Sequence, residues 1–428
     1  MPIIRFRDKP DMVAVSGMST FDAGTPPALR GAWIRQRLDE TAVTDFEAAI
    51  QSAVRAASIP TGARFALAVG SRGIDRLPEV VACLVNALHE RGARPFVIPA
   101  MGSHGGATAA GQRSVLAQLG VTFESVGCPI EATMDTVSEA RVDRLAYEAD
   151  AVIPINRVKP HTGFDGVHGS GLIKMMAIGL GNRIGASELH AQGYEGFAER
   201  LRAAAKDRMS VLRVPFGVAL VENGLGHLAT LECVPAVDFE LRDAALLQEA
   251  RERMARLPSS HLDVLIVDQI GKDISGVGMD PNVIGRDHRG QRTAGPHIQR
   301  IVVRGLTAAT GGHATGIGLA DLVLERVVRE LDQAKTWVNA LTARTPEYAR
   351  IPMSLQTDAE ALSAALICCH RREPGCERVL WVKDTHHLGT LWASEALLPE
   401  LISGGQCIAE GPVEALQFDE QGMLFSLG

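Results

Sequence analysis

The sequence lacks the features that mark several large classes of protein. Its 428 residues include only 4% aromatic residues, and 43 Lys and Arg are outnumbered by 50 Asp and Glu, which gives a net charge of −7. A chain without a basic tract or interleaved aromatics does not have the composition of a nucleic-acid-binding protein. It also has no apolar run long enough to span a bilayer and no signal-peptide core at its start. We therefore expect a cytoplasmic protein with neither nucleic acid nor membrane as a partner.

Cysteine is sparse and unpaired. The seven cysteines are an odd number, and none of them forms a Cys-x-x-Cys pair. This excludes a disulfide framework and the usual structural zinc sites. We interpret the cysteines as reduced thiols.

The composition and the order of segments predict an α/β fold. Hydrophobic residues make up 46% and charged residues 22%, so the chain can bury a substantial core. Short β-branched runs alternate with segments of helical period, which is typical of largely parallel sheets with flanking helices. The expected strands are 64–69, 94–98, 150–155, 217–221, 264–268, 299–303 and 379–383. Helices are expected at 78–91 and from about residue 108.

The length favours two domains. The clearest seam follows a charged helical segment, at Pro258–His261. We expect an N-terminal domain of residues 1–260, which residues 404–428 could rejoin, and a C-terminal domain of residues 261–403. The active site is expected in the cleft between these domains.

Three of the expected strands are followed by loops with reactive side chains. Ser71 and Arg72 follow the first strand, His104 follows the second and His161 follows the third. Ligands of open α/β sheets bind beyond the carboxyl ends of the strands, so these side chains should converge if the strands are neighbours. An arginine can grip a carboxylate, and a histidine can exchange a proton near pH 7. A histidine in a Gly-rich turn can also serve only to stabilise the turn.

A glycine-rich run follows and leads to a lysine within an apolar segment. Lys174 is flanked by Leu172-Ile173 and Met175-Met176, and an unpaired ammonium is costly to bury there. A partly desolvated lysine can be a nucleophile or an attachment point, although it can equally extend along a helix surface to water. The nearby Gly-x-Gly-x-x-x-Gly of residues 179–185 departs from the dinucleotide fingerprint, and we discount it as such.

These residues, taken in order, resemble the nickel-dependent lactate racemase family, whose members use a nickel-pincer nucleotide. The resemblance rests on Ser71-Arg72, Ser103-His104, Lys159-Pro160-His161, the run to Lys174, and Ser187-Glu-Leu-His190, and extends less closely to residues 275–286. Compared with the lactate enzymes, three residues are added between His161 and Lys174, and this loop brings in His168. Gly102-Ser103 stands where a bulky aromatic precedes the histidine, which favours a substrate larger than lactate.

The resemblance implies a role for each matched residue. His104 and His161 would be the catalytic acid–base pair, on opposite faces of the substrate. Lys174 would carry the cofactor, nickel pyridinium-3,5-bisthiocarboxylic acid mononucleotide, and His190 would ligate its nickel. The other expected cofactor-binding residues are Ser71, Arg72, Gly171 and Asn282, and the expected substrate-binding residues are Arg72, His168, Lys272 and Arg286.

The implied function is inversion of C2 in a 2-hydroxy carboxylate, such as malate, an aldonic acid such as gluconate, or lactate. A histidine is poorly matched to removing the α-proton of such an acid, whereas hydride removal needs an electron sink that a cofactor supplies. The implied partners are the small-molecule substrate and the proteins that build the cofactor. Whether the chain forms a homo-oligomer is left open. Two alternatives also remain open, a nicotinamide-dependent 2-hydroxyacid dehydrogenase and a non-catalytic protein that binds a small acid or nucleotide.

Overall fold

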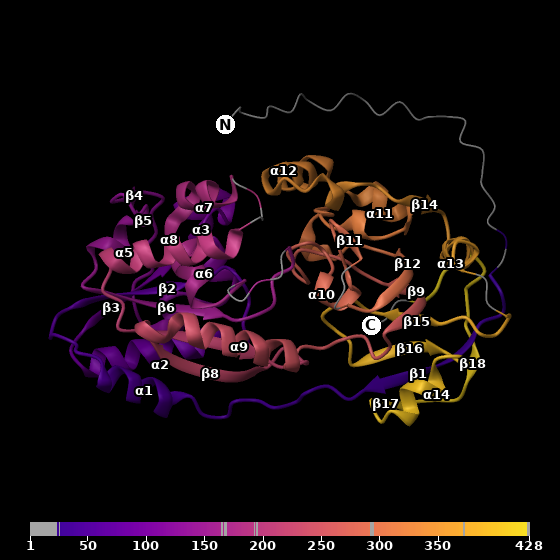
Figure 1. Ribbon diagram of the computed structural model, residues 1–428, viewed down its shortest axis with the longest axis horizontal. Coiled ribbons are helices and arrows are strands. Elements are labelled where there is room, and N and C mark those ends of the chain that lie inside the picture. The colour runs from indigo at the N-terminus through magenta and orange to yellow at the C-terminus, as the bar shows by residue number, and fades with distance from the viewer. Residues whose placement is uncertain are drawn as a thin grey trace. The chain divides into compact units, whose positions relative to one another are not determined.

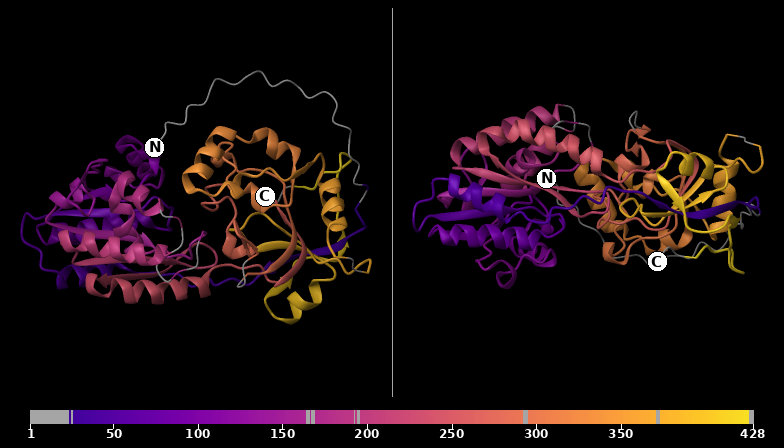
Figure 2. Two further views of the ribbon diagram at one scale, coloured as in Figure 1. Left: turned by 45° about the horizontal axis from the view of Figure 1, so that its top comes forward. Right: turned by 90° about the horizontal axis from the view of Figure 1, so that it is seen from below.

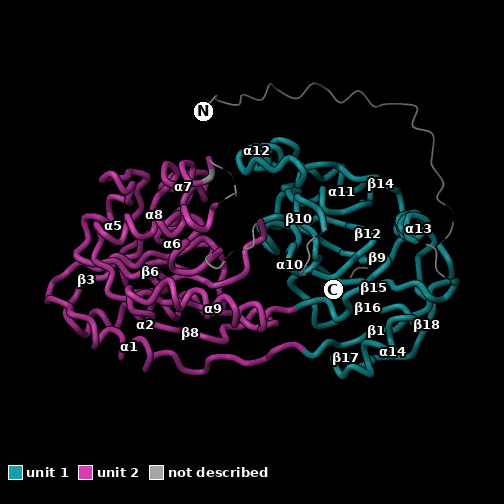
Figure 3. The backbone as a smooth tube through the Cα atoms, viewed as in Figure 1, with its two compact units in different colours: residues 1–37, 256–428 teal, residues 38–255 magenta. Residues whose placement is uncertain are grey.

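The computed structural model describes the chain as two compact units. It describes residues 24–425 except residues 25, 164–165, 167–168, 192, 194–195, 292–294 and 371–372, and it describes the backbone but not the side chain of His190. Unit 2 consists of residues 38–255, and unit 1 consists of the described residues up to Arg37 and from Arg256 onward (Figure 3). Each unit is built around its own sheet.

Unit 2 has a five-stranded sheet. The strands lie in the order β3-β2-β6-β7-β8, and the first four are parallel while β8 is antiparallel to β7. From β2 the chain passes through helix α2 to β3 on one side, whereas β6 lies on the other side and leads to β7. The connections that leave β2 and β6 therefore turn in opposite directions, which creates a switch point at their carboxyl ends. The strands are β2 (Arg64–Val69), β3 (Arg94–Pro99), β6 (Ala151–Arg157), β7 (Phe216–Glu222) and β8 (Leu228–Pro235).

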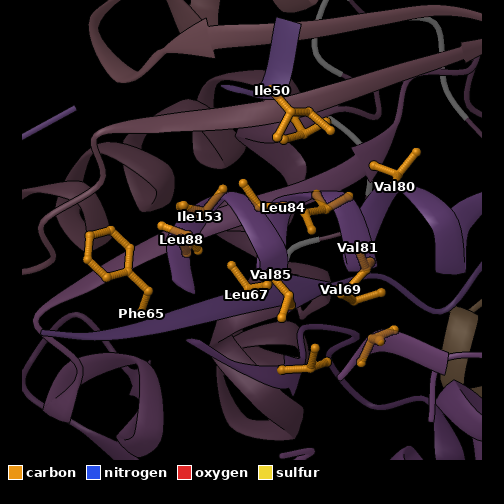
Figure 4. Packing of buried hydrophobic residues seen from close by; sticks show 14 of the residues in the cluster. Ile50, Phe65, Leu67, Val69, Val80, Val81, Leu84, Val85, Leu88 and Ile153 are labelled. Carbon is orange, nitrogen blue, oxygen red and sulfur yellow. The ribbon is translucent and has the colours of Figure 1, made fainter. Parts of the chain in front are cut away.

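Helices cover both faces of this sheet because its strands are hydrophobic on both faces (Figure 2). On one face, Leu67 and Ile153 pack with Leu84 of α2 and Ile50 of α1 (Figure 4). On the other face, the strands pack against α6, α8 and α9. The helices of unit 2 are α1 (Glu47–Ala56), α2 (Leu77–Glu90), α3 (Ala109–Gln118), α4 (Phe123–Val126), α5 (Arg144–Glu148), α6 (Leu172–Ala177), α7 (Asn182–His190), α8 (Phe197–Val211) and α9 (Phe239–Arg253), and β4 (Thr136–Val137) with β5 (Val142–Asp143) forms a small hairpin.

Unit 1 has a nine-stranded mixed sheet (Figure 1). Five parallel strands lie in the order β14-β13-β12-β9-β15, and β16, β1 and β17 continue the sheet with antiparallel pairing, while β18 also pairs with β1. The strands are β1 (Arg30–Gln36), β9 (His261–Val267), β12 (His297–Val303), β13 (Leu322–Leu324), β14 (Met353–Leu355), β15 (Val379–Val382), β16 (Thr390–Ser394), β17 (Cys407–Ala409) and β18 (Glu414–Ala415). The helices are α10 (Pro281–Ile284), α11 (Glu325–Glu330), α12 (Gln333–Ala343), α13 (Asp358–Ile367) and α14 (Leu398–Ser403), and β10 (Arg286–Asp287) pairs with β11 (Gly290–Gln291).

The expected fold class is confirmed, and every strand expected from the sequence is present within a few residues of its expected bounds. The domain boundaries differ from the expectation at both ends of the chain. Strand β1 pairs with β16 in unit 1, and β17 and β18 pair with β1, so residues 404–425 do not rejoin the N-terminal domain. The second crossing between the units falls at Arg256. Local patterning shows that a segment is a strand, but the choice of sheet depends on pairing between residues hundreds of positions apart.

A buried ion-pair network holds the C-terminal segment in unit 1. Arg304 is only 2% exposed and pairs with the carboxylates of Asp268 and Asp358. Its guanidinium also donates to the carbonyl oxygens of Leu424 (2.6 Å) and Phe425 (3.3 Å). These bonds fix residues 424–425 to the carboxyl ends of β9 and β12. Removing one partner would leave an uncompensated buried charge, which is costly. Among the helices described, none is both long enough and apolar enough to cross a membrane.

The placement of β1 makes a testable prediction. Ile34 of β1 and Ile50 of α1 are both fully buried, and only sixteen positions separate them, yet they belong to different units. Truncating either to alanine should cost about 2–5 kcal/mol. We expect Ile34→Ala to accelerate hydrogen exchange in peptides from residues 261–394, and Ile50→Ala to do so in peptides from residues 47–88. The reverse pattern would contradict the assignment of β1 to unit 1.

Candidate functional site

The carboxyl ends of three neighbouring strands in unit 2 lie at one edge of the sheet. Val69 at the end of β2 is in register with Pro99 of β3 and with Ile155 of β6. The loops that follow carry Ser71 and Arg72 after β2, His104 after β3, and His161 after β6. Ser71, Arg72, His104 and His161 therefore lie in loops that begin at the same edge of the sheet. This edge includes the switch point between β2 and β6.

Ser71 and His104 are in direct contact. The Ser71 Oγ atom lies 2.5 Å from Nδ1 of His104. The side chain of His104 is exposed. Gln112 is fully buried and stabilises the His104 loop, because its Nε2 donates to the carbonyl oxygen of Gly102 (2.9 Å). If Nδ1 of His104 carries the proton and donates to Ser71, its Nε2 is the ring nitrogen that can accept a proton.

His161 has a different hydrogen-bonding arrangement. The backbone N–H of Gly163 donates to its Nδ1 atom over 2.9 Å. A ring nitrogen accepts such a bond only without a proton, so in this arrangement the neutral ring carries its proton on Nε2. The two histidines therefore differ in the hydrogen bonds that select their tautomers.

Lys174 is the third residue of α6 and is partly buried. Desolvation by burial lowers its pKa to about 7, and the positive charge of Arg72 adds to this effect. Desolvation also lowers the pKa of Arg72, with a contribution from the positive charge of Arg157. The Nη1 atom of Arg157 donates a hydrogen bond to Oε2 of Glu222 at 2.6 Å. Three cationic side chains thus lie close enough to influence one another near the carboxyl ends of β2 and β6, and the charge of Arg157 is paired with Glu222. The remaining positive charge suits an anionic ligand.

The first turn of α6 is fastened from two sides. From β6, the Asn156 side chain donates to the carbonyl oxygen of Gly171 at 2.7 Å. From α9, the buried carboxylate of Asp243 accepts hydrogen bonds from the backbone N–H groups of Leu172 (3.0 Å) and Ile173 (2.7 Å). Burial raises the pKa of Asp243 to about 7, although these two bonds act in the opposite direction.

Asn156, Arg157 and Asp243 were not singled out from the sequence. Asn156 and Arg157 are the last two residues of β6 and stand only a few positions before His161. Asp243 lies 71 residues after Leu172, within an ordinary charged helix, and no local signal distinguishes it.

The glycines of residues 179–185 accommodate a buried arginine. Arg208 is 3% exposed, and it donates to the carbonyl oxygen of Ala177 at 2.7 Å. A Cβ atom at Gly181 or Gly185 would lie 2.6 or 2.5 Å from Arg208 NH2. Close packing against Arg208 therefore explains these two glycines, and no dinucleotide fingerprint is needed to account for them.

Two further candidate residues cannot be placed in full. His190 is the last residue of α7, but its side chain lies outside what the structure describes, and His168 lies outside the described residues altogether. Within the part of the chain that is described, no three His, Cys, Asp or Glu side chains are grouped so that they could hold a metal ion.

The candidates in unit 1 belong to that unit's own framework. Arg286 donates to Asp321 Oδ2 (2.7 Å) and to the carbonyl oxygens of Leu319 (3.0 Å) and Ile298 (3.0 Å), so most of its N–H groups serve the fold rather than a substrate. Asn282 is bonded to Asp280 Oδ1 through both its backbone N–H and its side chain (2.9 Å each). The backbone N–H of Lys272 donates to Thr310 Oγ1 at 3.2 Å.

The chain is thus an α/β protein of two units. In unit 2, Arg72, His104 and His161 follow the carboxyl ends of parallel strands, and Lys174 of α6 has a pKa of about 7. The chain belongs to the family described as "Domain of unknown function (DUF362)", which matches residues 69–286 and so spans all the candidate residues. No curated protein sequence matches the chain.

Two solved structures are similar to this chain at a low level. A protein from Thermotoga maritima, determined in a structural genomics programme, is 14% identical over 78% of this chain and 84% of its own, with a TM-score of 0.45. The lactate racemase apoprotein from Thermoanaerobacterium thermosaccharolyticum is 12% identical over 83% of this chain and 88% of its own, with a TM-score of 0.40.

The burial of Lys174 predicts a pH-dependent cost in stability. Because its pKa is lowered from 10.5 to about 7 on folding, Lys174 costs no stability above about pH 10.5, and the cost grows as the pH falls and is complete below about pH 7. We expect Lys174→Met to raise Tm at pH 6, by about 2–4 °C for each kcal/mol gained, and to raise it much less at pH 10. The matched control is Lys206→Met, an exposed lysine of α8, which should show no such difference. Equal gains for Lys174→Met at both pH values would contradict the burial of a charged amine.

Proposed function

We propose that this protein is an isomerase that inverts C2 of a 2-hydroxy carboxylate with the help of a nickel-pincer nucleotide attached at Lys174. The observation that carries the proposal is the lowered pKa of the Lys174 amine, about 7, to which the charge of Arg72 contributes. Arg72 follows a strand at the same sheet edge as His104 and His161. It is supported by the ordered resemblance of these residues to the nickel-dependent lactate racemase family. Among the substrates named above, malate and aldonic acids are favoured over lactate, because small residues precede His104.

The residues fit an anionic cofactor joined through an amine. An amine whose pKa is about 7 is largely unprotonated just above neutral pH, so its nitrogen lone pair is available for bond formation. The guanidinium group of Arg72 supplies positive charge for a phosphate or carboxylate group. Lys174 would hold the group covalently, Arg72 and Ser71 would bind its anionic part, and His190 would ligate its nickel. When bound, the cofactor would supply a hydride acceptor.

The chain's own residues would bind the substrate and move its hydroxyl proton. Arg72 would grip the substrate carboxylate and so fix the orientation of C2. Nε2 of His104 would take the hydroxyl proton from one enantiomer, with Ser71 holding the ring through Nδ1. His161 would serve the other enantiomer. To accept a proton at Nε2 it must first carry a proton on Nδ1 and release the N–H of Gly163.

The attachment of the cofactor can be tested without an activity assay. When the protein is coexpressed with cofactor maturation proteins, we expect intact-mass measurement and nickel analysis to show an added mass and bound nickel. Lys174→Ala should abolish the added mass, whereas Lys206→Ala should retain it. An unmodified, nickel-free wild-type protein under these conditions would refute the proposal.

The roles of the two histidines can be tested with the loaded protein. With malate as the substrate, we expect His104→Ala and His161→Ala each to reduce interconversion of the two enantiomers by at least about 100-fold, the usual contribution of a general acid or base. Chiral chromatography from each pure enantiomer measures this, and nickel content should remain at the wild-type level. Racemisation at an undiminished rate in either variant would remove that histidine from the mechanism.

A further inference from the structure

Helix α6 cannot hold Lys174 in place by its own hydrogen bonds. It has only six residues, and isolated helices of that length are unstable in water. Its N-cap residue is Gly171, which has no side chain to accept a bond from the first backbone N–H groups. The position of Lys174 must therefore be set by groups from other elements.

The carboxylate of Asp243 fills the place of the missing cap. Its Oδ1 atom accepts from Leu172 N at 3.0 Å and its Oδ2 atom from Ile173 N at 2.7 Å, so each oxygen holds one of the two residues that precede Lys174. Asp243 is only 1% exposed. Hydrogen bonds to a charged acceptor in such a place are stronger than neutral ones, and the N-terminal end of a helix favours negative charge.

Gly171 is shaped for this carboxylate. Its φ of +89° is a conformation that residues with a side chain rarely adopt, and a Cβ atom there would lie 2.5–2.8 Å from the atoms of the Asp243 carboxyl group. The carboxylate can therefore approach the helix start only because residue 171 is glycine. Asn156 holds the same glycine from β6 through its carbonyl oxygen, at 2.7 Å.

Building on the proposed attachment of the cofactor at Lys174, we propose that Asp243 is a positioning residue that keeps the Lys174 amine in its partly desolvated place. A carboxylate suits this role because both of its oxygens accept. An asparagine in the same place has one oxygen and one NH₂ group, and the NH₂ group would face a backbone N–H. The first turn of α6 would then loosen and admit water to Lys174.

Trace labelling with acetic anhydride across pH 5.5–10, read by peptide mass spectrometry, tests the proposal on the whole apoprotein. In the wild type we expect the reactivity of Lys174 to rise with a midpoint near its pKa of about 7. In Asp243→Asn the midpoint should move upward by at least about one pH unit, which corresponds to about a fivefold loss of free amine at pH 7. Exposed Lys206 serves as the internal reference in every sample.

The control variant is Glu252→Gln, which makes the same chemical change at an exposed position of α9. It should leave the Lys174 midpoint unchanged. A purely structural role for Asp243 would lower Tm without moving the midpoint of the folded protein. An unmoved midpoint in folded Asp243→Asn would therefore overturn the proposal.

If Asp243→Asn does not fold, the wild type still provides a test. Asp243 has a pKa of about 7, so protonation below neutral pH should weaken its bonds to Leu172 and Ile173. Hydrogen exchange of these two amides, corrected for intrinsic rate, should show at least severalfold less protection at pH 5.5 than at pH 8.5, and constant protection would refute the role. A midpoint shift in a protein that takes up no cofactor would support Asp243 and refute the proposed function, whereas uptake without a shift would do the reverse.

Discussion

The desolvation of positively charged side chains at the carboxyl ends of β2 and β6 is the constraint on which the candidate site depends. Burial lowers the pKa of both Arg72 and Lys174, and the charge of Arg157 on Arg72 and of Arg72 on Lys174 adds to this effect. Only Arg157 has an ion-pair partner identified among the described residues, Glu222 at 2.6 Å. Lys174 can accommodate its position by losing its proton near neutral pH, which an arginine cannot do. Burial, with the added effect of the Arg72 charge, therefore makes the amine nucleophilic.

Parallel strand pairing brings these groups together. β2 and β6 pair in parallel, from Phe65 with Ala151 to Val69 with Ile155. The loops that follow these strands therefore begin side by side at one edge of the sheet. The connections then turn in opposite directions and leave room beyond the strand ends. Lys174 reaches this edge from α6, whose start is fixed by Asn156 on one side and Asp243 on the other. The site is therefore assembled by backbone geometry and by two polar side chains that do not themselves carry the chemistry.

Seven of the strands, namely β2, β3, β6, β7, β9, β12 and β15, and the loop residues could be predicted from the sequence because both are local signals. A buried strand is a short apolar run, and reactive residues directly after it stand out, as Arg72 and His104 do. Asp243 could not be found in this way, because its partners lie 70 and 71 residues away and α9 has the pattern of an ordinary surface helix. The sheet membership of β1 was missed for the same reason, since its main partner β16 lies more than 350 residues further on. What remains hidden in the sequence is pairing across long separations.

A racemase must treat two mirror-image substrates alike, yet the two histidines of this site are held differently. His104 contacts a hydroxyl group, which can either donate or accept, so Ser71 permits either tautomer of the ring. His161 contacts a backbone N–H, which can only donate, so this bond stabilises the form with a proton on Nε2. Proton uptake by His161 thus carries the additional cost of breaking the bond to Gly163, about 0.5–1.5 kcal/mol for an ordinary hydrogen bond. For malate, whose two C2 forms are enantiomers, the equilibrium constant is still one, so this cost must appear equally in the forward and reverse barriers through the same transition states. For an aldonic acid the two C2 forms are epimers, and their own free energies set the equilibrium constant. The asymmetry of the protein can change the rate of racemisation but not its endpoint.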